Sequence, residues 1–71
     1  MRDTRTNKLA SNIRAERSRK GVSQEFLCEK LNISTRTLSS IENSWQKPSI
    51  FVLIDIAKAL EIDINILLDG V

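Results

Sequence analysis

The chain has 71 residues, of which 41% are hydrophobic, and a formal net charge of +2. A chain of this length forms one domain that buries about 60% of its unfolded surface, and no apolar run approaches the roughly 20 residues that cross a bilayer. With one cysteine and no histidine, the chain excludes a disulfide scaffold and a zinc site, and we expect no metal and no cofactor. A lone cysteine is typical of a reducing compartment such as the cytoplasm.

The charge is distributed unevenly along the chain. Residues 1–20 carry seven basic and two acidic residues, a net charge of +5, whereas residues 21–71 carry four basic and seven acidic residues, a net charge of −3. Such asymmetry fits either a basic face for a polyanion or a solvated helix with a polar tail. We predict a flexible N-terminal arm over residues 1–7 and a single domain over residues 8–71. Arg2 and Arg5 in this arm either reach a nucleic acid or have no role.

The first helical pattern runs from about Lys8 to Lys20. Leu9, Ile13 and Arg17 lie along one stripe,. Gly21 stands where a glycine commonly ends a helix in the left-handed conformation. Because Arg17 falls on the inward stripe, its charge needs a buried partner.

The stretch GVSQEFLCEKLNISTRTLSSIEN contains two further short helical patterns. Ser23 is an N-cap candidate for a helix over Gln24–Leu31, and Asn32 ends this helix because asparagine tolerates positive φ. Ser34 caps the next helix, which runs from Thr35 to about Asn43. Two helices of about two turns joined by roughly three residues have the geometry of a helix-turn-helix.

The C-terminal part of the chain is strongly apolar. Ser49 caps a predicted helix over about Ile50–Leu60, and Asp63 caps a short fifth helix that continues through Leu68. The residues that follow Leu60 are more apolar than one short helix can bury beneath itself, and this surplus indicates a protein partner. The apolar residues concerned are Ile62, Ile64, Ile66, Leu67, Leu68 and Val71.

Within the predicted helix-turn-helix, the run resembles phage-repressor and Cro-like (XRE-type) bacterial regulators. The resemblance rests on Ser23-Gln24, Cys28, Asn32 and Ile41-Glu42-Asn43. Cys28 stands where this family usually has alanine, and Asn32 where it usually has glycine, but both keep the small size and the tolerance of left-handed φ that the motif requires. The resemblance extends from about Leu9 to Leu68. It implies an all-α, compact five-helix lambda-repressor-like DNA-binding domain with the helix-turn-helix at helices 2 and 3.

The same resemblance implies a function. The expected protein is a sequence-specific regulator of transcription, a repressor or small controller without enzymatic activity, in the cytoplasm of a bacterial or phage-infected cell. It binds double-stranded DNA as a homodimer on a pseudo-palindromic operator. A chain of 71 residues leaves no room for a ligand-binding domain, so we expect control through dimerisation, protein concentration or a second regulatory protein.

The expected site residues form four groups. Short hydroxyls and an arginine at the outward start of the third helix suit base edges in the major groove: Thr35, Arg36 and Ser40. Side chains near the phosphates are expected to contact the DNA backbone: Gln24, Thr37, Asn43 and Lys47. The family pattern implies a structural ion pair between Arg17 and Glu42. It also implies a dimer interface at the C-terminal helix and its flanks: Ile62, Ile64, Ile66, Leu67 and Val71.

Two aromatic residues have no assigned role. Phe26 replaces a residue that is usually polar in this family, and it fits either a satellite of the core or a contact for a partner. Trp45 fits a phosphate contact, a lid on the core or a contact with a second subunit. Together with the apolar C-terminus they motivate an alternative function, a protein-binding module of the same fold with weak or no specific DNA binding.

Overall fold

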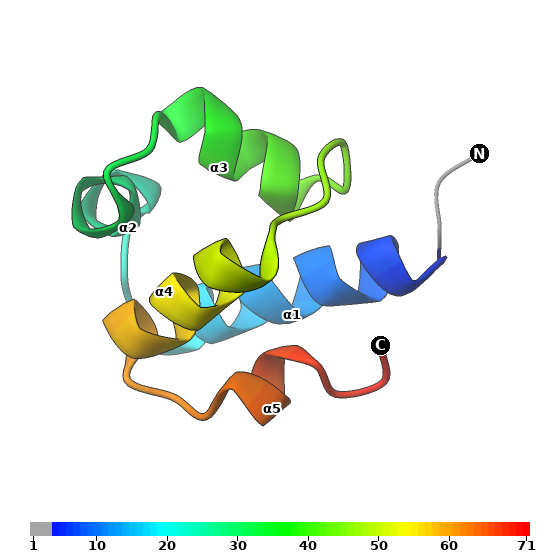
Figure 1. The fold of residues 1–71 in the computed structure, drawn as a ribbon. Coiled ribbons are helices and arrows are strands. Elements are labelled where there is room, and N and C mark those ends of the chain that lie inside the picture. Colours follow the sequence, from blue (N-terminus) through cyan, green and yellow to red (C-terminus); the bar gives the residue numbers. More distant parts are fainter. Residues whose placement is uncertain (1–3) are drawn as a thin grey trace.

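Five helices make up residues 4–71, the part of the chain that the computed structural model describes: α1 (Thr4–Arg19), α2 (Gln24–Leu31), α3 (Thr35–Glu42), α4 (Ile50–Leu60) and α5 (Ile64–Leu67). In Figure 1, α1 and α4 lie in the middle of the molecule, α2 and α3 above them and α5 below. The predicted all-α, five-helix architecture is confirmed. None of the described helices combines the length and apolar character that a membrane crossing requires.

Helix α1 begins at Thr4, about four residues earlier than the sequence pattern predicted. Thr6 is buried, with 8% exposure, and it extends the inward stripe of Leu9 and Ile13 toward the N-terminus. The hydrophobic pattern stopped short because threonine does not count as an apolar residue. The predicted flexible arm over residues 1–7 is therefore wrong for residues 4–7, which are helical and include Arg5, while residues 1–3 with Arg2 lie outside the described residues.

Four of the helices begin at caps that the sequence predicted. A side-chain oxygen accepts a hydrogen bond from a backbone N–H of the first helical turn at Ser23, Ser34, Ser49 and Asp63. Each of these bonds satisfies one of the N–H groups that a helix start leaves without a partner. Gly21 follows α1 with φ of 68°, the left-handed conformation expected after a helix end,.

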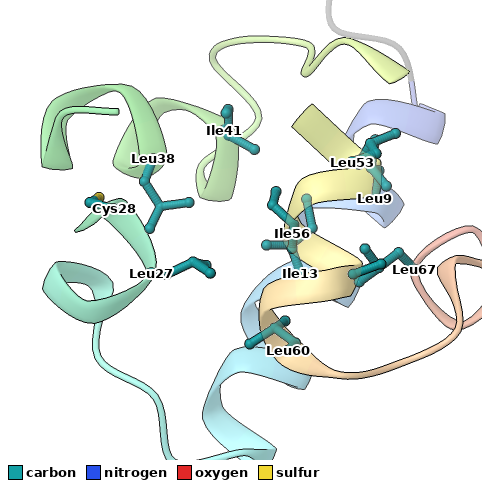
Figure 2. Close-up of a cluster of buried hydrophobic side chains, with 11 residues drawn as sticks. Leu9, Ile13, Leu27, Cys28, Leu38, Ile41, Leu53, Ile56, Leu60 and Leu67 are labelled. Atoms are coloured by element: carbon teal, nitrogen blue, oxygen red, sulfur yellow. The ribbon is translucent and has the colours of Figure 1, made fainter. Parts of the chain in front are cut away.

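All five helices contribute to one hydrophobic core (Figure 2). Its members are Leu9, Ile13, Leu27, Cys28, Leu38, Ile41, Leu53, Ile56, Ala57, Leu60 and Leu67. The apolar members of the inward stripe predicted for α1, Leu9 and Ile13, are among these residues. Because Leu38 and Ile41 fix the inner face of α3, the opposite face of α3 is turned to solvent.

The C-terminal segment is attached to α1 by one side chain. The amide Nδ2 of Asn12 donates to the backbone carbonyls of Leu67 and Asp69, at 2.9 Å and 2.8 Å. Leu67, the last residue of α5, is fully buried in the core. These contacts make α5 part of the monomer rather than a separate appendage.

Candidate nucleic-acid interface

Three residues connect α2 and α3, and they have the backbone geometry that the sequence predicted. Asn32 adopts the left-handed conformation, with φ of 56° and ψ of 45°. The backbone N–H of Ile33 donates to the carbonyl of Cys28 at 3.1 Å, which closes the end of α2,. Ser34 then caps α3 directly. The turn therefore fixes the direction of α3 relative to α2 without a flexible linker.

Cys28 is a core residue, as the sequence indicated. Its side chain is 5% exposed. Burial, and then the nearby carboxylate of Glu42, raises the pKa of the Cys28 thiol. The thiol stays protonated near neutral pH and acts as a small apolar group at the contact between helices.

The buried carboxylate of Glu42 joins α1, α2 and α3. The Nε of Arg17 donates to Glu42 Oε2 at 2.7 Å, and Gln24 Nε2 donates to Glu42 Oε1 at 2.8 Å. A second arginine, Arg14, donates from Nη1 to the backbone carbonyl of Glu42 at 2.9 Å. Glu42 is 2% exposed, so Arg17 and Gln24 supply the compensation that its buried carboxylate requires,. The ion pair implied for Arg17 and Glu42 is present.

The contact with Glu42 was not foreseen for Gln24, which the family pattern assigns to the DNA backbone. An amide nitrogen carries two hydrogens, and Glu42 uses one of them,. The second hydrogen and the carbonyl oxygen of Gln24 have no partner in residues 4–71. Gln24 is half-buried at the first position of α2, so its side chain is held in one orientation at a helix N-terminus.

The outer face of α3 carries the side chains predicted to contact bases. Thr35 and Arg36 are exposed, while Ser39 and Ser40 are half-buried beside them. Arg36 makes no hydrogen bond or ion pair with any other residue in the described range. Its five guanidinium N–H groups are therefore available to an external acceptor such as a guanine edge.

Two of the predicted backbone contacts have partners inside the protein. The hydroxyl of Thr37 lies 3.0 Å from the Ser34 hydroxyl, within the cap of α3. The amide Nδ2 of Asn43 donates to the Ser39 carbonyl at 2.8 Å and lies 3.3 Å from the Ser39 hydroxyl. Thr37 and Asn43 thus stabilise the two ends of α3.

Trp45 and Lys47 lie in different hollows after α3. Trp45 is 74% exposed, which rules out the lid on the core. It lines a hollow of about 250 Å³ together with residues of the outer face of α3: Arg36, Ser39, Ser40 and Asn43. Lys47 is also exposed, but it lies beside Arg5 in another hollow, at the start of α1. Trp45, unlike Lys47, therefore lies beside the outer face of α3.

The predicted dimer interface needs one correction. Leu67 is fully buried in the monomer core and presents no surface to a second subunit. Ile62 and Ile64 are partly buried and pack against the same core. Ile66 and Val71, each 42% exposed, keep accessible apolar surface. The sequence predicted too many exposed apolar residues after Leu60, because a short helix was expected to bury little. In the structure, α5 inserts Leu67 between α1 and α4.

The sequence reasoning missed a second exposed apolar surface, in the first turn of α4. Ile50 is 54% exposed and Phe51 is 74% exposed. Phe51 shares its side of the helix with the polar residues Asp55 and Lys58, because residues four and seven positions apart lie on the same face. The position of an aromatic residue on the polar side of an amphipathic helix could have predicted that Phe51 is exposed.

A family model described as helix-turn-helix (HTH_3) matches residues 13–67. The chain belongs to this helix-turn-helix family. The match contains α2, α3, α4 and α5 completely, together with residues 13–19 of α1. The family resemblance seen in the sequence is confirmed. A search among curated proteins gave no match for this HTH_3 chain.

Solved structures of similar proteins superpose over nearly the whole chain. The restriction-modification controller protein C.AhdI from Aeromonas hydrophila is 25% identical, with a TM-score of 0.86, covering 92% of this chain and 98% of that one. A mutant of the controller protein C.Esp1396I is 29% identical, with a TM-score of 0.87 and coverages of 97% and 87%. The clp gene regulator ClgR from Corynebacterium glutamicum is 25% identical, with a TM-score of 0.90 and coverages of 97% and 73%.

Proposed function

We propose that this protein is a transcriptional regulator that binds double-stranded DNA and reads its operator with α3. The observation that carries this proposal is the difference between the two faces of α3. The inner face is fixed through Leu38, Ile41 and the Glu42 network, while Arg36 on the outer face has no partner in the described range. A rigid helix that presents unpaired donors is what recognition of base edges requires.

The proposed contacts follow the order of residues along α3. Thr35, Arg36 and Ser40 contact base edges, with Arg36 binding a guanine through its two terminal nitrogens. The DNA backbone contacts come from the periphery of the same surface: Gln24, Thr37, Asn43 and Lys47. Because Gln24 keeps one amide hydrogen beyond its bond to Glu42, it can donate to a phosphate without losing its place in the network,.

We further propose that the protein acts as a homodimer on a pseudo-palindromic operator. The exposed apolar residues at the start of α4, Ile50 and Phe51, support this, together with Ile66 and Val71 in the C-terminal segment. A monomer measures 30 × 24 × 20 Å, close to the spacing of about 34 Å between successive major-groove faces. Two copies side by side are therefore of the right size to reach two half-sites.

The decisive experiment measures binding of the purified protein to the DNA upstream of its own gene by fluorescence anisotropy. Random DNA is the control, and the salt concentration is varied. We expect tighter binding to the specific fragment, and a fall in affinity of about 10³-fold between 50 and 200 mM salt if several phosphates are contacted. Equal and weak binding to both DNAs, with little salt dependence, would instead favour a protein-binding module.

The dimer is tested separately, by sedimentation of Phe51→Ser against Phe26→Ser. Both variants replace an exposed aromatic residue, but only Phe51 belongs to the proposed interface. We expect Phe51→Ser to weaken self-association and Phe26→Ser to leave it unchanged. Equal sedimentation of both variants and the unmodified protein as dimers would place the interface elsewhere, whereas a monomer at all concentrations would remove the homodimer from the proposal.

A further inference from the structure

A hollow of about 700 Å³ lies between α2, α4 and the end of α1, and we name it the α2–α4 groove. Figure 1 shows these three elements next to one another at the side of the molecule away from the N-terminus. The lining residues are Lys20, Val22, Phe26, Lys30, Leu31, Asp55, Lys58, Ala59, Leu60 and Glu61. None of them is among the residues proposed for DNA or for the second subunit.

Phe26 gives the groove an exposed aromatic wall. Its side chain is 44% exposed, although it is the residue next to the fully buried Leu27. The ammonium of Lys30 lies 5.4 Å from the centre of the Phe26 ring, one helical turn away,. The ring thus lies near a cation, and both residues line the groove. Phe26 is not among the residues that pack against the core, which favours a contact with a partner over a satellite of the core.

The lysines of the groove are not neutralised by the protein. Lys20, Lys30 and Lys58 form no ion pair with any residue in the range 4–71. Two carboxylates, Asp55 and Glu61, line the same groove without pairing with them. Three ammonium groups against two carboxylates leave the groove with an excess of one positive charge above an apolar floor, which is complementary to a ligand that is both anionic and apolar.

This chemistry argues against a second copy of the chain as the occupant. A two-fold contact through the groove would bring together two copies of one patch that carries three lysines and two carboxylates, so both sides would have the same excess of positive charge,. An acidic partner matches this charge better than a second copy does. A nucleic acid would satisfy the lysines but would leave the apolar floor of Val22, Leu31 and Ala59 without a partner.

We propose that the α2–α4 groove binds an acidic amphipathic segment of a partner protein. An apolar side chain of that segment packs against Phe26 and the floor of the groove, and its carboxylates pair with Lys20, Lys30 and Lys58. Because α3 takes no part in the groove, the partner and DNA can be bound together. The inference does not depend on specific DNA binding, and it gives the second regulatory protein a defined contact surface.

The test uses a synthetic fluorescent peptide of about 14 residues with leucines at helical spacing and glutamates elsewhere. Its binding to the full chain is followed by anisotropy, and a peptide with lysine in place of each glutamate is the control. We expect the acidic peptide to bind and the basic peptide not to bind. Amide NMR shifts of the labelled protein should change at Phe26, Lys30 and Ala59 rather than along α3.

Variants of the groove distinguish a built site from general attraction between charges. Lys30→Glu and Lys58→Glu, tested one at a time, should each weaken peptide binding about tenfold. Lys8→Glu makes the same change in net charge at an exposed position of α1 and should change binding less than twofold. Phe26→Ser should weaken binding, and Phe51→Ser should not. Equal effects of Lys30→Glu and Lys8→Glu, shifts confined to α3, or no binding of the acidic peptide at millimolar concentration would each overturn the proposal.

Discussion

The two faces of α3 differ in how the protein uses its polar groups. On the inner face, the side chain of Glu42 is almost completely buried and accepts hydrogen bonds from Arg17 and Gln24. On the outer face, Arg36 extends into solvent and has no partner within residues 4–71. Polar groups on the inner face fix the position of α3 in the fold, whereas those on the outer face remain available to a ligand outside the protein.

Within the eight residues of α3, the groups that stabilise the fold therefore lie on one face and the groups available for binding lie on the other. A change on the inner face should affect folding and binding together, because α3 loses its position. A change on the outer face should affect binding alone. Substitutions on the two faces of α3 and at its ends test this separation.

Replacing Glu42 with alanine should destabilise the protein most. The substitution leaves the largely buried Arg17 guanidinium without its anion, which costs about 3 kcal/mol of unfolding free energy. For a domain of this size that is a fall in Tm of about 15 °C. Thermal unfolding followed by circular dichroism measures it, with Glu29→Ala, an exposed glutamate in α2, as control. Equal stability of the two variants would contradict the role of the Glu42 network.

Replacing Arg36 with alanine should change binding without changing stability. If Arg36 reads a guanine, operator affinity falls by about 1–3 kcal/mol and the preference at one base pair relaxes. The unfolding free energy should stay within about 0.5 kcal/mol of the original. Lys58→Ala removes the same charge far from α3 and serves as the binding control. A uniform loss on all sequences would assign Arg36 to a phosphate instead.

Replacing Arg14 with alanine tests the boundary between the two faces. Its guanidinium donates to the backbone carbonyl of Glu42 at the end of α3. Because Arg14 is exposed and the bond is partly solvated, we expect a loss of about 1 kcal/mol in unfolding free energy. Urea denaturation measures this loss, and Arg36→Ala provides the same chemical change without a lost internal bond. A larger loss of unfolding free energy for Arg36→Ala than for Arg14→Ala would contradict the difference between the two faces.

Replacing the turn residue Asn32 with glycine should have the smallest effect. Its left-handed conformation suits glycine better than asparagine, so Asn32→Gly should raise the unfolding free energy by about 0.5 kcal/mol. Asn32→Ala should lower it by about 1 kcal/mol, since alanine has no side-chain polar group to offset the strain. Operator preference should remain the same in both variants. Destabilisation by glycine would show that the asparagine side chain is needed in the turn.

Much of the fold could be predicted because its signals are local. A helix start is predicted by a serine whose side chain caps the first turn, as at Ser23, Ser34 and Ser49. A helix end is predicted by Asn32, because asparagine tolerates the left-handed backbone conformation. The early start of α1 escaped prediction because Thr6 is buried although its side chain is polar. The left-handed cap of α4 at Glu61, with φ of 57°, also escaped, since glutamate gives no signal for that conformation.

The candidate site was predictable only in part, for a different reason. The positions of Thr35, Arg36 and Ser40 on the outer face follow from helical periodicity alone. The bond from Gln24 to Glu42 joins residues 18 positions apart, and no periodicity predicts it. Whether Leu67 or Phe51 is exposed depends on how α4 and α5 pack, which the composition of either helix does not reveal.

The position of Trp45 has a practical consequence. It is the only tryptophan in the sequence, which contains no tyrosine, and it lies beside Arg36 and Ser40 at the end of α3. Ultraviolet emission of this protein therefore comes from one indole next to the surface that would meet DNA. The chain carries its own optical reporter, so a titration can be followed by intrinsic fluorescence without any attached dye.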